Sequence, residues 1–281
     1  MQNKVLLNRK VYDLGPDCYQ LLIGNPTTYR GRQAAHAFEK IHAIEFKPLS
    51  EENLRSLVAE PLLKENTTSF WNTYRRKHKE LTKQTTRDIA HQSIKYLMKQ
   101  EKNESLSASF PVGSTLNELY ITQNWSKSLK KLQTSIDTHQ YRVKNGISSG
   151  KQGVLIEGDS SLGKTSFIRA LLEKNQIDFV DLTGRRVEDI EGLLLQAFDG
   201  GKYVLWDEIN TTAPLFKRLL NHLMSGTDLE KNPPKKQGFF IIGTLNAASG
   251  YTGRVPLDPA LENRFEKQGD HIHLCQYIPY C

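Results

Sequence analysis

The sequence lacks a long apolar run and is poor in cysteine, and both absences narrow the class of protein. No segment approaches the roughly 18 consecutive apolar residues that a membrane-spanning helix needs. The opening stretch MQNKVLLNRK is too polar for a secretory signal peptide. The three cysteines, Cys18, Cys275 and Cys281, show no paired spacing. We therefore expect a cytoplasmic protein of a reducing compartment that makes no use of a membrane.

A platform of interleaved aromatic and basic residues is also missing. The net charge of +7 comes partly from the clusters YRRKHK, KSLKK and KNPPKK, at 74–79, 127–131 and 231–236. Such clusters are usually solvated faces of helices or loops, although they can also attract nucleic acid. Because no stacking platform accompanies them, nucleic acid is the less favoured partner. With 281 residues, 38% of them hydrophobic and 25% charged, the chain is typical of a soluble globular protein with one large core or two smaller ones.

The strongest chemical signal is GVLIEGDSSLGKTS, at 153–166. An apolar run predicts a strand, a Gly-x-x-x-x-Gly-Lys-Thr pattern follows, and SFIRALLEK then predicts a helix. In that order the loop N–H groups and the positive end of the helix can hold a polyphosphate. Lys164 would reach the β- and γ-phosphates and Thr165 would ligate Mg²⁺. The candidate nucleotide-binding residues are Gly158, Asp159, Ser160, Ser161, Leu162, Gly163, Lys164, Thr165 and Ser166.

Two further apolar runs deliver polar residues at their ends. KYVLWDEIN, at 202–210, predicts a buried strand that ends in Asp207 and Glu208. Asp207 would hold the Mg²⁺ from its outer coordination sphere, and Glu208 would orient and activate the attacking water. GFFIIGTLN predicts a strand that ends at Asn246, beside the strand that carries Asp207. The Asn246 amide could hydrogen-bond both the lytic water and the γ-phosphate.

A candidate arginine follows in PALENRFEK, at 259–267. Arg264 would lie near a helix end, where a guanidinium can stabilise phosphoryl charge at a neighbouring subunit's site. Taken alone, Arg264 is equally compatible with a surface ion pair. His271, His273 and Cys275 alternate along a predicted final strand and could ligate a metal, but such alternation is more typical of a sheet core.

These elements together resemble the AAA+ ATPases, in the branch that includes midasin, dynein and MoxR-type proteins. The resemblance covers about residues 115–278: LIEGDSSLGKTS resembles Walker A, VLWDEIN resembles Walker B, Asn246 takes the sensor-1 position and Arg264 the arginine-finger position. It implies an α/β fold, a three-layer P-loop core around a parallel sheet. It also implies ATP and Mg²⁺ as cofactors, and neighbouring AAA+ modules or copies of the same chain as ring partners.

The chain departs from the family pattern in three places. Ala247 replaces the usual Pro after the sensor-1 Asn. The segment RRVEDIEGLLLQAFDGG is too short for the β-hairpin insert of this branch. The sequence stops after HIHLCQYIPYC, where a C-terminal helical lid is expected to begin, so the sensor-2 chemistry of that lid has no residue here.

The motif before the finger has a near copy early in the chain. GNPTTYRGR, at 24–32, resembles GTLNAASGYTGR, at 243–254, and places Asn25 at the sensor-1 position. Ser50 then predicts a helix cap, and helical patterns continue to about residue 102. Against a full repeat, Ala37 takes the place of Arg264, and residues 1–50 could instead be an unrelated α/β or hairpin segment.

We therefore interpret the chain as a window on a tandem array. Residues 1–48 would be the tail, or last strands, of a preceding AAA+ module. Residues 49–114 would be a mainly helical, lid-like region with a linker, and residues 115–281 an AAA+ P-loop core without its lid.

The predicted function is ATP binding and hydrolysis that drives remodelling of a protein substrate of unknown identity within a ring. The alternatives are a nucleotide-binding scaffold without turnover and a nucleic-acid-directed motor. Activity of the isolated chain should be low, because a finger from a neighbour is needed. The sequence carries no Asn/Thr-Lys-x-Asp motif for guanine, which favours ATP, but relatives that use GTP leave that nucleotide open.

Overall fold

The chain divides into two compact units, Met1–Lys47 and Pro48–Cys281. The computed structural model describes residues 4–7, 10–13, 50–78, 81, 84–101, 109–158, 162–246, 257–266 and 272–274. In the first unit β1 (Lys4–Leu7) pairs with β2 (Lys10–Asp13) as an antiparallel hairpin. The near copy of the motif at 24–32 lies outside the described residues, so the repeat stays a prediction.

The second unit is built on a parallel sheet, as the sequence predicts. Its strand order is β6-β7-β8-β5-β9, and every pair of neighbours is parallel. The strands are β5 (Gly153–Gly158), β6 (Phe179–Asp181), β7 (Tyr203–Trp206), β8 (Phe240–Leu245) and β9 (Ile272–Leu274). The expected strands around 154–156, 203–206 and 240–245, and the expected final strand, are confirmed.

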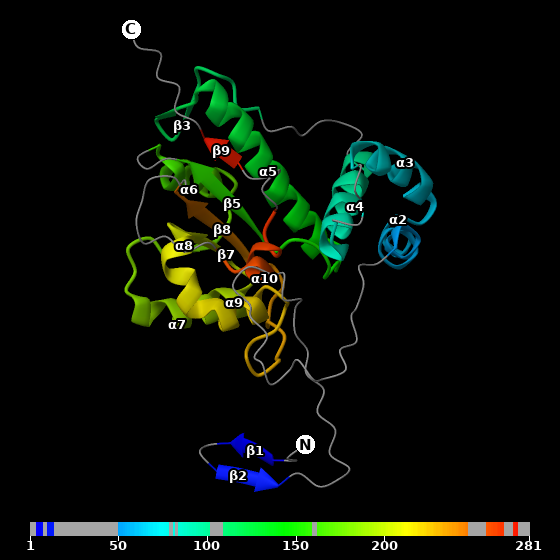
Figure 1. Ribbon diagram of the computed structural model, residues 1–281. Helices are drawn as coiled ribbons and strands as arrows, with labels where there is room; N and C mark the ends of the chain where they lie inside the picture. The colour runs from blue at the N-terminus through cyan, green and yellow to red at the C-terminus, as the bar shows by residue number, and fades with distance from the viewer. Residues whose placement is uncertain are drawn as a thin grey trace. The chain divides into compact units, whose positions relative to one another are not determined.

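Helices cover both faces of this sheet (Figure 1). Successive residues of a strand point to opposite faces, so Val154 and Ile156 join the apolar cluster under α5 (Gln123–Lys144) and α6 (Lys164–Lys174), whereas Leu155 joins the cluster under α7 (Val187–Gly200) and α9 (Lys217–Leu223). These side chains are 0 to 1% exposed, which explains why the central strands are continuous apolar runs. The helices are α5 (Gln123–Lys144), α6 (Lys164–Lys174), α7 (Val187–Gly200), α8 (Ile209–Thr212), η5 (Ala213–Phe216), α9 (Lys217–Leu223) and α10 (Pro259–Glu262).

A short hairpin precedes α5. Its strands are β3 (Thr115–Leu116) and β4 (Leu119–Tyr120), and both turn residues, Asn117 and Glu118, have positive φ. Phe110 is 1% exposed and packs into the cluster under α5 and α6. The core therefore includes Phe110, which lies in the range 49–114 that the sequence assigns to the lid-like region and its linker.

Residues 50–101 form a helical region with its own apolar cluster, which includes Phe70, Trp71 and Ile89. The Ser50 hydroxyl accepts a hydrogen bond from the Asn53 amide at 3.2 Å, so the predicted cap is confirmed. The elements are α1 (Glu51–Leu54), the π-helix η2 (Arg55–Ala59), α2 (Glu60–Leu63), η3 (Lys64–Asn66), α3 (Thr67–Lys77) and α4 (Thr86–Glu101). Whether this region is the lid of a preceding module stays a prediction. No helix among the described residues is long and apolar enough to cross a membrane.

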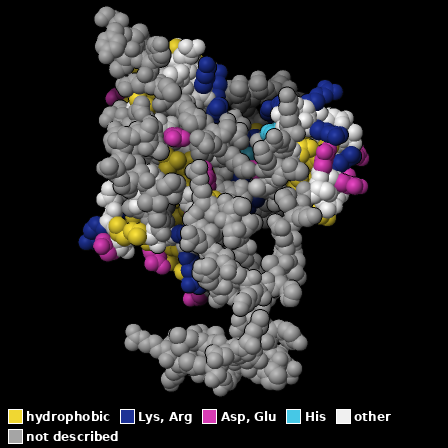
Figure 2. Space-filling view, viewed as in Figure 1, with side chains coloured by type: hydrophobic (Ala, Val, Ile, Leu, Met, Phe, Trp, Pro, Cys, Tyr) yellow, Lys and Arg dark blue, Asp and Glu magenta, His cyan; other side chains and the backbone are white. Residues whose placement is uncertain are grey.

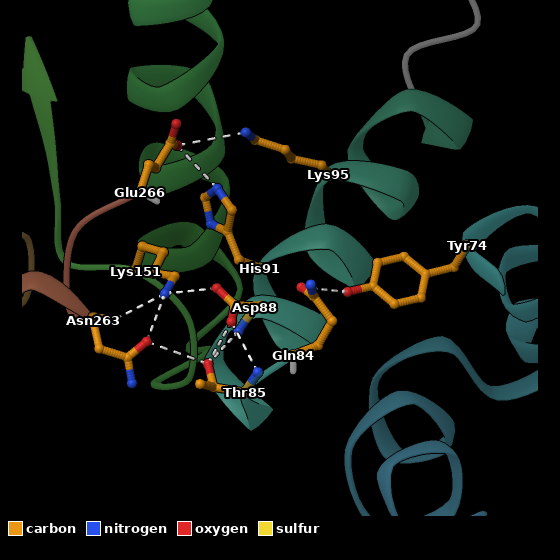
Figure 3. Close-up of polar contacts among 9 residues, drawn as sticks. All are labelled: Tyr74, Gln84, Thr85, Asp88, His91, Lys95, Lys151, Asn263 and Glu266. Carbon is orange, nitrogen blue, oxygen red and sulfur yellow. Dashed lines mark hydrogen bonds and ion pairs between the residues drawn. The ribbon is translucent and has the colours of Figure 1, made fainter. Parts of the chain in front are cut away.

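Helix α4 meets the sheet region through buried charges (Figure 3). Lys151 Nζ lies 2.7 Å from Asp88 Oδ1, and their side chains are 2% and 8% exposed. Burial opposes ionisation of Asp88, but the Lys151 charge and hydrogen bonds from Lys151 and Thr85 outweigh it and lower its pKa to about 2. Burial opposes ionisation of Glu266 as well, but a hydrogen bond from His91 and the Lys95 charge lower its pKa to about 2.

Acid should weaken this interface. Both carboxyl groups ionise in the folded chain with a pKa of about 2, below their ordinary values of 3.8 and 4.5. Their contribution to the free energy of unfolding is therefore full above those ordinary values and is lost as the pH falls toward 2. We expect the urea midpoint to fall between pH 6 and pH 3, and to fall less in Asp88→Asn. Equal falls in the two proteins would show that Asp88 does not contribute.

Gly153 opens β5 at a point where no side chain fits. A Cβ there would lie 2.5 Å from the Ile241 carbonyl oxygen and 2.7 Å from the Phe265 ring. We expect Gly153→Ala to lower the free energy of unfolding by about 1–3 kcal/mol, because a packed core resists added volume. Gly192→Ala is the control, because a Cβ at that exposed position in α7 would meet nothing within 4 Å. Alanine is the better helix former, so this change should raise the free energy of unfolding by about 0.5–1 kcal/mol. Urea unfolding of both variants measures these changes. A Gly153→Ala variant as stable as the parent chain would contradict the close packing at Gly153.

Candidate active site

Three neighbouring strands end at the same edge of the sheet and deliver the candidate residues there. Gly158 ends β5, Asp207 directly follows β7, and Asn246 directly follows β8, which lies between the other two. Helix α6 begins at the same edge, after Gly163 in the left-handed conformation with φ 73°. The first N–H groups of a helix have no acceptor within it and carry its positive end. This edge therefore combines the positive end of a helix with acidic and amide side chains.

Lys164 is held between the loop and the β8 strand end. Its side chain is buried, with the residue 6% exposed. Its ammonium donates to the Gly158 carbonyl oxygen and to Asn246 Oδ1, each at 2.9 Å. The cation is thus fixed at the start of α6, beside the two strand ends.

Asp207 is held against the hydroxyl of Thr165. Thr165 Oγ1 donates to Asp207 Oδ1 at 2.7 Å, and Thr244 Oγ1 donates to the same oxygen. A hydroxyl and a carboxylate are oxygen ligands of the kind Mg²⁺ prefers, and Mg²⁺ commonly takes only one or two protein groups beside water and phosphate. The residues present therefore fit a Mg²⁺ ion that a nucleotide brings with it. Within the described residues no three His, Cys, Asp or Glu side chains gather into a larger metal cluster.

Glu208 has an unusual backbone conformation, and two partners hold it there. Its φ is 48°, a left-handed value that costs a non-glycine residue about 1–3 kcal/mol. Its amide donates to Thr244 Oγ1 at 2.9 Å, and its Oε1 accepts from Asn246 Nδ2. Asn246 therefore connects Lys164 to Glu208, and the Thr244 hydroxyl bonds both to Asp207 and to the Glu208 amide.

Sequence reasoning missed Thr244. It is 0% exposed, and its position in the otherwise apolar run GFFIIGTLN was the available signal. A buried hydroxyl needs a partner, and here it orients both acidic residues.

Part of the predicted loop lies outside the described residues. Asp159, Ser160 and Ser161 belong to that part, whereas Leu162 packs against the apolar cluster under α5 and α6. The side chains of His271, His273 and Cys275 also lie outside what the structure describes, so the predicted alternative of a metal site there is untested.

Arg264 lies away from this edge. Its carbonyl oxygen accepts from the Gln152 amide at 2.9 Å, directly before β5 begins, whereas the phosphate-loop motif follows the end of β5. Six extended residues separate the two points, or roughly 20 Å. The guanidinium donates to the Ala260 carbonyl and to Ser225 Oγ. Burial and the nearby charge of Arg87 lower the pKa of Arg264 to about 10. Arg264 is therefore not brought to the candidate site of its own core.

Basic side chains do not form one patch on the described part of the face in Figure 2, where Lys and Arg lie in separate groups with Asp and Glu among them. Several lysines have acidic partners, including Lys202 with Asp178 and Lys235 with Asp199. This arrangement gives no specific support to the nucleic-acid alternative.

Comparison with known proteins gives weak and partial similarity. No protein-family model matches the chain. Over 66% of the present chain the sequence is 24% identical to midasin of Giardia intestinalis. Over 48% of the present chain it is 26% identical to midasin of Dictyostelium discoideum. It is 34% identical to the uncharacterized protein YojN of Bacillus subtilis (strain 168) over 28% of its length. These matches span 4%, 3% and 27% of the relatives' own lengths. The similarity to midasin, an AAA+ ATPase, supports the AAA+ family in general and nothing narrower.

Proposed function

We propose that residues 115–281 form an AAA+ core that binds ATP with Mg²⁺ and hydrolyses it. The observation that carries the proposal is the hydrogen-bonded set at the carboxyl edge of the sheet. Lys164 bonds to Asn246, Asn246 to Glu208, and Thr165 to Asp207. A cation, a base, an amide and a metal-ligating hydroxyl thus lie together at a helix N-terminus, which is the chemistry that phosphoryl transfer requires.

In this proposal Lys164 and the N-terminus of α6 bind the phosphates. The Lys164 ammonium already faces two oxygen acceptors, and a charged phosphate oxygen is a stronger acceptor than either. Asp207 holds the Thr165 hydroxyl in place. Bound Mg²⁺ would supply charge neutralisation at the phosphates.

Glu208 and Asn246 would act on water. The water oxygen bonds to the γ-phosphorus, the bond from that phosphorus to the bridging oxygen breaks, and ADP leaves with the electron pair. The Glu208 carboxylate takes the proton from the water. Asn246 bonds to Glu208 and to Lys164, so it can set the base relative to the phosphate-binding cation.

The finer part of the proposal concerns assembly. Arg264 lies at the opposite end of β5 from Gly158, which supports a role at the site of a neighbouring module or copy in a ring. The isolated chain would then hydrolyse ATP slowly, and the movement of modules would remodel a protein substrate.

Lys164→Ala tests the binding part. We expect it to weaken ATP binding by roughly 10- to 100-fold, because a charge-assisted hydrogen bond to phosphate is lost. Isothermal titration calorimetry with ATP in the presence of Mg²⁺ measures the two affinities.

Lys174→Ala is the matched control. Lys174 is exposed at the other end of α6, where its ammonium lies over the Phe110 ring. It should leave ATP binding unchanged. If Lys164→Ala bound ATP as tightly as the parent chain, Lys164 would not be the cation that binds the phosphates.

A further inference from the structure

The segment that carries Arg264 is fixed to the sheet on both sides of that residue. The Gln152 amide donates to the Arg264 carbonyl oxygen, and the Glu266 amide donates to the Gly153 carbonyl oxygen at 3.1 Å. Between them Phe265 is 0% exposed and forms a bridge with Gly153. The backbone around Arg264 thus lies beside the first residues of β5 and runs parallel to them.

Helix α4 holds the residue before Arg264. Lys151 Nζ donates to the Asn263 carbonyl oxygen at 2.8 Å while it pairs with Asp88 of α4. Thr85 Oγ1 also lies 3.4 Å from Asn263 Oδ1. Asp88 uses its second carboxylate oxygen to accept from the Thr85 amide and hydroxyl, which ties this contact to the start of the helix.

The same helix holds Glu266, two residues after Arg264. Glu266 Oε1 lies 2.9 Å from His91 Nε2 and 3.5 Å from Lys95 Nζ, both on α4, and accepts from Ser135 Oγ of α5 at 2.8 Å. The side chains of Glu266 and His91 are 5% and 6% exposed. Figure 3 shows the two contacts side by side along one face of α4.

The guanidinium donates to the Ala260 carbonyl oxygen and to Ser225 Oγ. Arg264 Nε has no hydrogen-bond partner among the described residues, and Arg87 of α4 is close enough for its charge to lower the pKa of Arg264. The position of the guanidinium therefore depends on these two hydrogen bonds and on the backbone that carries it. Buried ion pairs contribute little net stability after desolvation, but they can specify one arrangement of two elements.

We propose that helix α4 positions Arg264. Asp88, through Lys151, and His91 with Lys95, through Glu266, fix the two ends of the segment, so a movement of the helical region changes where the guanidinium is presented. Asp88, Lys151 and Glu266 are positioning residues in this scheme. Its consequence for turnover rests on the proposed function, in which Arg264 acts on a neighbouring nucleotide site.

Hydrogen exchange tests the positioning without any need for turnover. The double variant Asp88→Asn/Lys151→Met removes both charges, so that neither is left buried alone. We expect the amides of residues 264–266 to exchange at least about ten-fold faster than in the parent chain, because their segment opens locally. The amides of β7 should stay unchanged. Asp199→Asn, which removes an exposed partner of Lys235, is the control and should change neither. Unchanged exchange at 264–266 in the folded double variant would overturn the proposal.

A double-mutant cycle on ATP turnover separates positioning from simple stabilisation. We expect Asp88→Asn/Lys151→Met to lower kcat in concentrated protein and leave ATP affinity unchanged. When Arg264→Ala is already present, the double variant should lower kcat no further, because both changes remove the same contribution of Arg264 to turnover. Additive losses would show that the buried pair acts only on stability and would overturn the link to Arg264. A parent chain that hydrolyses no ATP would defeat the proposed function, and the exchange result would still decide the positioning.

Discussion

Glu208→Gln is expected to bind ATP and Mg²⁺ as tightly as the parent chain and to lose about 10²–10⁴ of its turnover, the usual contribution of a general base. Glutamine keeps the size of the side chain and can still bond to Asn246, which holds Glu208 in the structure. It cannot accept a proton from water. The phosphate-binding groups, Lys164 and the start of α6, are untouched. Calorimetry measures binding and phosphate release measures turnover.

Glu191→Gln is the control for this substitution. Glu191 is exposed on α7, so the same chemical change there should affect neither quantity. If Glu208→Gln turned over as fast as the parent chain at saturating ATP, another group would activate the water. If the parent chain bound ATP without turnover, the scaffold alternative would hold.

Arg264→Ala is expected to remove the dependence of turnover on protein concentration. Arginine fingers contribute about 10³–10⁵ to turnover in related phosphoryl-transfer systems. Arg264 lies at the opposite end of β5 from Gly158, so in the proposed function it serves the site of a neighbouring module or copy. Turnover per chain should therefore rise with concentration in the parent protein and stay low in Arg264→Ala, while ATP binding persists in both.

Mixing two inactive variants sharpens this test. Lys164→Ala keeps Arg264, and Arg264→Ala keeps the nucleotide site, so a mixture should recover part of the turnover that each lacks alone. Arg76→Ala, an exposed position on α3, is the control and should behave as the parent chain. Fast hydrolysis by a monomeric sample, unchanged in Arg264→Ala, would show that one chain holds a complete site.

Strong, continuous patterns allowed the central strands and the site to be predicted. The runs that become β5, β7 and β8 are apolar because helices cover both faces of the sheet, and polar residues follow each run at once. Since parallel strands end at one edge, Lys164, Asp207, Glu208 and Asn246 could be expected to lie together. Their hydrogen bonds show that proximity, and their chemical roles stay predictions.

Weaker local signals explain what sequence reasoning missed. β6 is short and only partly buried, and the turn between β3 and β4 has Asn117 and Glu118 at positive φ where glycine is usual. The contacts of α4 could not be predicted from the sequence for another reason. Asp88, Lys151 and Glu266 read as ordinary solvated charges, because their partners are far away in the sequence and burial of a charge depends on the tertiary fold.

The account depends most directly on whether the purified chain releases inorganic phosphate from ATP. Phosphate release should be followed over a range of protein concentrations, with saturating ATP and Mg²⁺, beside Glu208→Gln as the blank. We predict release above that blank, at a rate per chain that rises with protein concentration. A parent chain that is folded, binds ATP and yet releases no more phosphate than Glu208→Gln at any concentration would contradict the proposal of an ATPase.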